Sequence, residues 1–224
     1  MENSFKAAHE YDFLKEEDVE KHFADLNISL LSGRHIDNRS YRLFSILEKY
    51  EDQWRDYFCN LYQLSLVHNI FDGEVFYYLE FFSSGKARFA DNSRHKPLTE
   101  MQTITALTLL DMYYQKYFED QKIITWTDLR RQIEESDHKE NYQRILFNTI
   151  RVSYSESEWQ SAEKKFRDAI TSFDKLGWVV KQSAQGEELV FEIRPSIHRI
   201  AGLYEAELAD FNNFSLQLKT PEII

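Results

Sequence analysis

The chain has few of the residues that mark disulfide-bonded, metal-binding or irregular proteins. Its 224 residues include one cysteine, six glycines and three prolines. A single cysteine excludes an internal disulfide and any CxxC metal site. Cys59 has the apolar neighbours Phe58, Leu61 and Tyr62. This setting predicts that Cys59 is an ordinary core residue.

Long apolar runs are also absent. The longest, such as 61–66 and 75–82, are far shorter than the roughly 18 residues needed to cross a bilayer. The start of the chain, residues 1–6, lacks the basic and apolar regions of a signal peptide. We therefore expect a cytoplasmic protein without membrane contact. With 42% hydrophobic and 15% aromatic residues, the chain can build the cores of one or two globular domains.

Signatures of chemistry are missing as well. There is no glycine-rich phosphate loop, zincin helix, nucleophile elbow or nucleotide fingerprint. No two of the seven histidines have the four-residue spacing of metal ligands on a helix. We expect no cofactor, no metal and no enzymatic activity.

Basic charge is scarce, with 27 basic against 38 acidic side chains and a net charge of −11. This balance argues against a main surface coated for nucleic acid, and any DNA contact must be local. Residues 86–96 are an exception, with four basic residues and one acid. Such a charge run is typical of a solvated face.

The clearest pattern lies at 155–195, where an amphipathic helix leads directly into a two-stranded hairpin. Ser155 and Glu158 have capping-box spacing, and Gly177 suits a helix C-cap. Apolar residues recur between them every three or four positions: Trp159, Ala162, Phe166, Ala169, Ile170, Phe173 and Leu176. Strands at 178–181 and 189–193 follow. This order predicts a winged-helix domain, in which the last helix can enter a DNA groove and the hairpin is the wing.

The N-terminal half repeats this order. A helix begins at the acidic residues 16–18 and is closed by Gly33, and a short extended piece and further helices continue to about Gln63. Strands 64–69 and 75–82 then flank Asp72 and Gly73, a strong hairpin signal. The chain therefore predicts an α+β, mainly helical fold with two tandem winged-helix domains.

The predicted boundaries follow from these patterns. They give an N-terminal arm at 1–15, a first winged-helix domain at 16–83, a linker at 84–97, a second winged-helix domain at 98–204 and a C-terminal tail at 205–224. In the second domain, 98–118 is apolar almost all round, which predicts a buried helix. A last helix is expected at 196–207.

Four short segments have an order and spacing shared with a known family. They read Ser-Gly-Arg-His-Ile at 32–36, Phe-Tyr-Tyr-Leu at 76–79, Leu-Gly-Trp-Val at 176–179 and Phe-Glu-Ile at 191–193. Over about 26–203 the chain resembles MukE, the small non-SMC subunit of a bacterial condensin. Its length fits the shorter relative MksE better.

The resemblance implies a homodimer that binds a kleisin subunit, like MukF or MksF, and through it an SMC ATPase like MukB or MksB. Such a complex entraps DNA at the nucleoid for chromosome condensation and segregation, or for plasmid defence. One departure concerns DNA. The MukE pattern has a basic pair before the Leu-Gly of the second domain, and Asp174 and Lys175 stand here instead. This difference argues against direct DNA contact by that helix.

Two surfaces are candidates for partners. Strand 75–82 is apolar on both faces, so one face can enter the core while the other needs a second surface. The residues of this second face are Phe76, Tyr78 and Phe82. The dimer mate, the kleisin or the linker could each cover them. The helix at 98–118 and the N-terminal domain together have surplus apolar surface, which predicts self-association.

Any DNA contact would use the basic residues near the last long helix and its wing: Lys164, Lys165, Arg167, Lys175 and Lys181. With so few cations, binding should be weak and insensitive to sequence. The alternative is a free-standing winged-helix transcription regulator. Such a regulator needs a basic recognition surface, and this chain is acidic overall.

Overall fold

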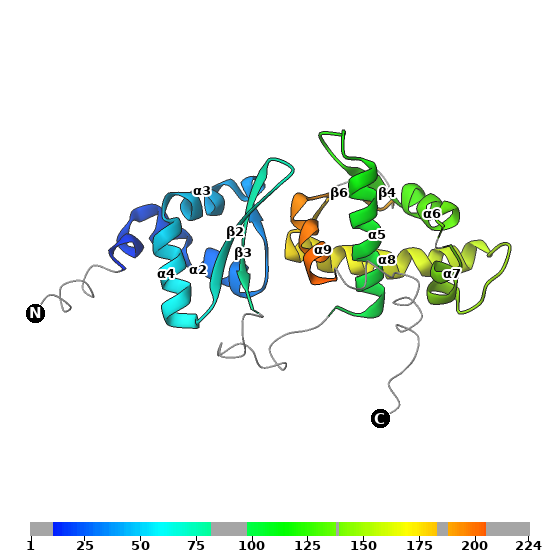
Figure 1. Ribbon diagram of the computed structural model, residues 1–224, viewed down its shortest axis with the longest axis horizontal. Coiled ribbons are helices and arrows are strands. Elements are labelled where there is room, and N and C mark those ends of the chain that lie inside the picture. The colour runs from blue at the N-terminus through cyan, green and yellow to red at the C-terminus, as the bar shows by residue number, and fades with distance from the viewer. Residues whose placement is uncertain (1–10, 82–97, 138, 183–187, 205–224) are drawn as a thin grey trace, which may run out of the picture. The chain divides into compact units, whose positions relative to one another are not determined.

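The structure, a computed structural model, describes residues 11–81, 98–137, 139–182 and 188–204. These residues form an α+β, mainly helical protein with two small antiparallel sheets, which confirms the α+β, mainly helical part of the predicted fold. The chain divides into two compact units, Met1–Pro97 and Leu98–Ile224. Figure 1 labels most of the helices and strands of both units.

The first unit consists of helices followed by a hairpin. Its elements are η1 (Asp12–Lys15), α2 (Glu17–Leu31), β1 (Ile36–Asp37), η2 (Asn38–Ser40), α3 (Tyr41–Lys49), α4 (Glu51–Tyr62), β2 (Ser65–Phe71) and β3 (Glu74–Glu80). Asp72 and Gly73 both have positive φ, 53° and 74°, as a two-residue type I′ turn requires. The sheet order is β1-β3-β2, with Ile36 opposite Tyr77 and Leu66 opposite Leu79.

Trp54 lies at the centre of the first unit's core. Its side chain is fully buried, and the ring centroids of Phe13, Phe23 and Phe58 lie 5.0, 6.1 and 5.8 Å from its own. Contacts of this kind add to the burial energy of each ring. The core therefore joins η1, α2 and α4.

Two sequence predictions for this unit need correction. Residues 11–15 were expected to belong to a loosely held arm, yet Phe13 is buried against Trp54 and Tyr50. Cys59 was expected in the core and is exposed. The buried face of α4 carries Trp54, Tyr57 and Phe58, and Cys59 lies about 100° further round the helix than Phe58.

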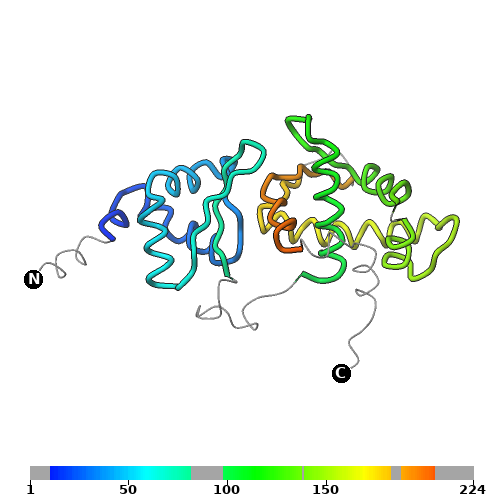
Figure 2. The backbone as a smooth tube through the Cα atoms, in the orientation of Figure 1, coloured from blue at the N-terminus to red at the C-terminus, as the bar shows by residue number. Residues whose placement is uncertain are grey.

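The second unit has the same order of elements, with one more helix before the hairpin and with η4 and α9 after it. Its elements are α5 (Glu100–Gln115), β4 (Ile123–Thr125), α6 (Trp126–Glu135), α7 (Lys139–Phe147), α8 (Glu156–Leu176), β5 (Val179–Lys181), β6 (Val190–Ile193), η4 (Pro195–His198) and α9 (Arg199–Leu203). The sheet order is β4-β6-β5. In both units, therefore, the last strand lies between the first and the second. Figure 2 shows α5 crossing the long α8, against which it packs.

Three helices of this unit, α5, α6 and α8, begin at a polar N-cap residue. The hydroxyls of Thr99, Thr125 and Ser155 accept hydrogen bonds from backbone N–H groups three residues ahead and form capping boxes with Gln102, Asp128 and Glu158. Gly177, at φ 74°, ends α8 in the left-handed conformation. The predicted start and stop of this helix are confirmed.

Other boundaries differ. The helix expected at 98–118 ends at Gln115, and the helix expected from Ser196 begins as the 3₁₀ turn η4. Pro195 explains this turn, since it fixes φ and donates no backbone hydrogen bond. Phe82, the linker at 84–97, the turn at 185–187, residues 1–10 and the tail at 205–224 lie outside the described residues.

Candidate interaction surfaces

Helix α8 carries four of the five predicted DNA-binding residues, and β5 carries the fifth, Lys181. Trp159, Phe166 and Phe173 are buried on the inner face, at 3% exposure or less. Lys164 and Lys175 are exposed on the other face. Eleven residues separate them, so they lie about 16 Å apart along the helix axis.

The five candidate cations have different partners. Arg167 forms an ion pair with Glu163 at 2.6 Å, and Lys165 donates from Nζ to the carbonyl of Leu146 at 3.1 Å. Lys181 donates from Nζ to Oγ1 of Thr171 at 3.4 Å. Among the described residues, Lys164 and Lys175 form no ion pair, not even the spacing-compatible pair of Lys164 with Asp168.

These contacts leave three cations along α8 and the adjoining β5: Lys164, Lys181 and Lys175. Asp168 is exposed on the same helix, and Asp174 accepts the backbone N–H of Lys181 at 3.1 Å. The surface is thus mixed in charge. It can hold a few phosphates but offers no ordered set of base-reading groups.

The hairpin of β2 and β3 is more deeply buried than the sequence suggested. Tyr77 and Leu79 belong to the core cluster of the first unit. Phe76 and Tyr78, on the other face of β3, are 1% and 7% exposed. The ring of His35 stacks on Tyr78, with centroids 4.8 Å apart. These two candidate partner-binding residues are therefore not on the open surface, and their role stays a prediction.

A polar cluster fixes the hairpin to α4. Glu51 accepts hydrogen bonds from Tyr77 Oη at 3.0 Å and from Arg55 at 2.5 Å, and its carboxylate lies 2.9 Å from His68 Nδ1. Burial, followed by the hydrogen bond to Glu51, raises the pKa of the Tyr77 hydroxyl well above its usual value. The tyrosine therefore stays a neutral donor, and β2 and β3 are both held to the start of α4.

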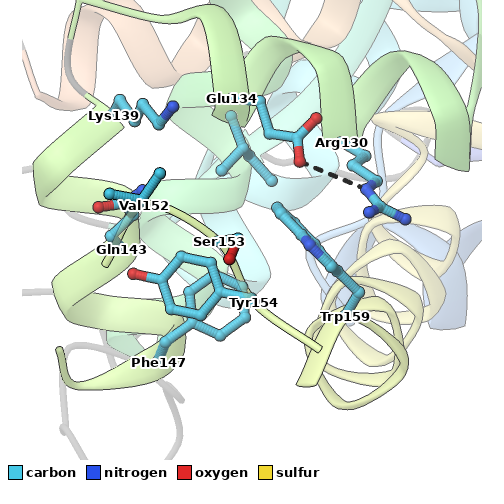
Figure 3. Close-up of a pocket in the computed structure, with 10 residues that line it drawn as sticks. Arg130, Glu134, Lys139, Gln143, Phe147, Val152, Ser153, Tyr154 and Trp159 are labelled. Carbon is cyan, nitrogen blue, oxygen red and sulfur yellow. Dashed lines mark ion pairs between the residues drawn. The ribbon is translucent and has the colours of Figure 1, made fainter. Parts of the chain in front are cut away.

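A cavity of about 160 Å³ lies between α6, α7 and the loop that precedes α8 (Figure 3). The rings of Phe147 and Tyr154 stack with centroids 3.8 Å apart, and Trp159 meets Phe147 edge-on at 5.1 Å. Arg130 lies over Trp159 and forms an ion pair with Glu134 at 3.5 Å. The cavity is smaller than typical small-molecule sites, about 300–1,000 Å³, and suits a single side chain.

The cavity residues were missed because 136–154 shows no clear periodicity in the sequence. Tyr154 orders this loop by donating to the carbonyl of Thr149 at 2.6 Å and accepting the N–H of Arg151 at 3.1 Å. Val152 at its rim is fully exposed. The aromatic spacing from Phe147 to Tyr154 and Trp159 was the available signal, but nothing in the sequence shows that the three rings meet.

The surface at the end of α5 is also apolar. Tyr114, Tyr117 and Phe118 are 45%, 51% and 97% exposed. Desolvation raises the pKa of the Tyr114 hydroxyl, and its ring meets His198 edge-on at 6.4 Å. Exposed apolar side chains here are compatible with the predicted self-association, which stays a prediction.

The described residues contain no group of three or more His, Cys, Asp or Glu side chains placed to hold a metal ion. No described helix is long and apolar enough to cross a membrane.

Taken together, the described residues form a two-unit α+β protein with a mixed-charge face on α8 and exposed apolar side chains at the end of α5. The sequence pattern of the family described as condensin complex protein MksE matches residues 21–203. The chain belongs to the MksE family and is a subunit of a condensin-type complex. A search of curated proteins finds no match to this chain.

Proposed function

We propose that this chain is the kleisin-binding, non-catalytic subunit of a condensin-like SMC complex and that it acts as a homodimer. The family match over 21–203 carries the proposal. Through the kleisin, the chain would join an SMC ATPase at the nucleoid and support DNA entrapment. Chromosome organisation and plasmid defence both fit this role.

We also propose that each unit is a winged-helix domain. In each unit a helix, a strand, further helices and two strands follow one another, and the third strand lies between the first and second. In a winged-helix domain, the hairpin that follows the last long helix, here α4 or α8, forms the wing. The domains would span 16–83 and 98–204, joined by the linker at 84–97.

Binding of a kleisin tests the proposal. The purified chain is mixed with the kleisin encoded in the same genome and passed over a sizing column. Co-elution as one complex is expected. A matched control is K164E/K175E, which changes the outer face of α8 and should leave kleisin binding unchanged. Separate elution of the two proteins at micromolar concentration would contradict the proposal.

The first wing is the proposed kleisin contact, through Phe76, Tyr78 and Phe82. Because Phe76 and Tyr78 are buried, serine substitutions there would open cavities and destabilise the fold, typically by several kcal/mol. Hydrogen exchange of the intact proteins is the cleaner test. Amides of β3 should exchange more slowly in the complex. Unchanged exchange at 74–81 in a stable complex would remove the wing from the interface.

A further inference from the structure

The two sheets present four edge strands among the described residues, and three of them are very short. β1 has two residues and includes Asp37, β4 has three residues, and β5 has three and ends at Lys181. Short length and charged side chains are common protection against unwanted strand pairing. These three edges are therefore protected.

The fourth edge, β2, is open. It has seven residues, Ser65–Phe71, and contains no proline, glycine, lysine or acidic residue. Residues 65–70 make no backbone hydrogen bond within the described chain except those of the ladder with β3. Ile70 on this strand is 63% exposed. A row of free N–H and C=O groups remains along the edge.

This strand is also held rigid. The turn at Asp72 and Gly73 fixes its register with β3, and His68 is held at Glu51 of α4. Because little conformational entropy remains to be lost, pairing with another strand costs less than for a flexible segment. The edge is preorganised for strand addition.

We infer that β2 pairs antiparallel with β2 of a second copy of this chain, joining the two first units through a continuous sheet. This inference rests on the proposed homodimer and names its surface. The partner segment that binds the β2 edge has to be a free strand, because a strand matches a whole row of backbone donors and acceptors. A second copy brings an edge of equal length, and a two-fold axis matches the two edges residue by residue.

The distribution of charge also favours a second copy of the chain as the partner at β2. Each chain has a net charge of −11, so two copies repel each other over most of their surface. β2 carries no acidic side chain, and pairing along it brings together neutral residues. Centring the two-fold axis on His68 places Ile70 opposite Leu66 of the second copy. The exposed side chain of Ile70 is then covered in the paired state.

A matched pair of variants tests this surface. Ile70→Lys adds a charged side chain to the edge, whereas Ile28→Lys makes the same change on α2, where Ile28 is 68% exposed. Light scattering is measured over a concentration series with a reducing agent, because Cys59 is exposed. The wild type and Ile28→Lys should be dimers of about twice 26.9 kDa. Ile70→Lys should raise the dimer dissociation constant by roughly tenfold or more.

Hydrogen exchange of the wild type provides a second readout that needs no variant. Amides of 65–70 should become more protected as the dimer forms with rising concentration. The inference is overturned if the wild type is a monomer, if Ile70→Lys is as dimeric as Ile28→Lys, or if these amides do not respond. Kleisin binding by folded Ile70→Lys separates the two proposals: retained binding with a lost dimer leaves the proposed function standing.

Discussion

At the scale of single residues, Ser155 illustrates how one hydroxyl positions the longest helix. Its Oγ accepts the backbone N–H of Glu158, and the Glu158 carboxylate accepts the backbone N–H of Ser155 at 2.8 Å. The backbone N–H and the hydroxyl of Ser155 both donate to the Glu158 carboxylate and, with a further contribution from Arg151, lower the pKa of the Glu158 carboxyl. Because the pKa of Glu158 is lower in the folded state than in the unfolded state, these interactions stabilise the fold at neutral pH. Their contribution is lost as the pH falls below the pKa of the unfolded carboxyl and then through that of the folded carboxyl.

The cap can be tested by Ser155→Ala. The variant should lose about 1 kcal/mol of unfolding free energy, because a backbone donor at the start of α8 is left without its partner. Chemical denaturation at pH 7 measures the loss. Ser161→Ala, on the exposed face of the same helix, is the control and should cost nothing. Equal stability of the two variants would show that the cap does not hold the helix.

Tyr142 gives a second residue-scale prediction, in alkali. Burial raises the pKa of its hydroxyl to about 12, and that hydroxyl is hydrogen bonded to Oγ1 of Thr108 at 2.9 Å. The unfolded tyrosine ionises near its usual value of about 10. The folded state therefore keeps a proton that the unfolded state loses, so this stabilisation is complete below about pH 10 and declines toward pH 12.

Between pH 8 and 11, the unfolding free energy of the wild type should therefore decrease more than that of Tyr142→Phe. The reason is that only the wild type has an ionisable group at position 142. Denaturant midpoints at both pH values give the comparison. At pH 8 the variant should lose roughly 1 kcal/mol with the hydrogen bond. Parallel declines of the two proteins would contradict the assignment.

At the scale of elements, the sequence predicted what local signals determine. The cap and C-cap of α8 and the Asp72–Gly73 turn lie within a few residues of what they control, and all are found. The burial of Phe13 depends on Trp54, which lies 41 positions further along the chain, and the aromatic cavity depends on an unpatterned loop. Such long-range contacts have no local signal, so they were missed.

The prediction for the scale of elements concerns Gly177, the C-cap of α8. Its φ of 74° is a conformation that costs an L-residue about 1–2 kcal/mol. Gly177→Ala should therefore destabilise the chain by about that amount. Gly202→Ala is the control: Gly202 lies inside α9, and an added Cβ would meet nothing within 4 Å. A thermal melt of both variants checks the difference, and an equal midpoint would refute the role of the C-cap.

At the scale of the whole molecule, the net charge of −11 limits any contact that the chain could make with DNA. Among the described residues of α8 and β5, Lys164, Lys175 and Lys181 are exposed and have no carboxylate partner, while the exposed Lys165 donates to the carbonyl of Leu146. Three phosphate contacts correspond to a log–log salt slope of about −3. We therefore expect weak binding without sequence preference, and DNA held mainly by the assembled complex.

Titration of labelled duplexes of several sequences checks this expectation. K164E/K175E should abolish the residual binding, whereas Lys21→Glu, an exposed lysine on α2, should retain most of it. Tight, sequence-selective binding at about 0.15 M salt would instead favour a transcription regulator over a complex subunit.

The central claim is that this MksE-family chain is a dimeric, kleisin-binding subunit. The most direct measurement is the mass of its complex with the kleisin from the same genome, by light scattering during size exclusion. The account predicts one species that contains two copies of the 26.9 kDa chain together with kleisin. Separate peaks for kleisin and for a free monomer of this chain would contradict it.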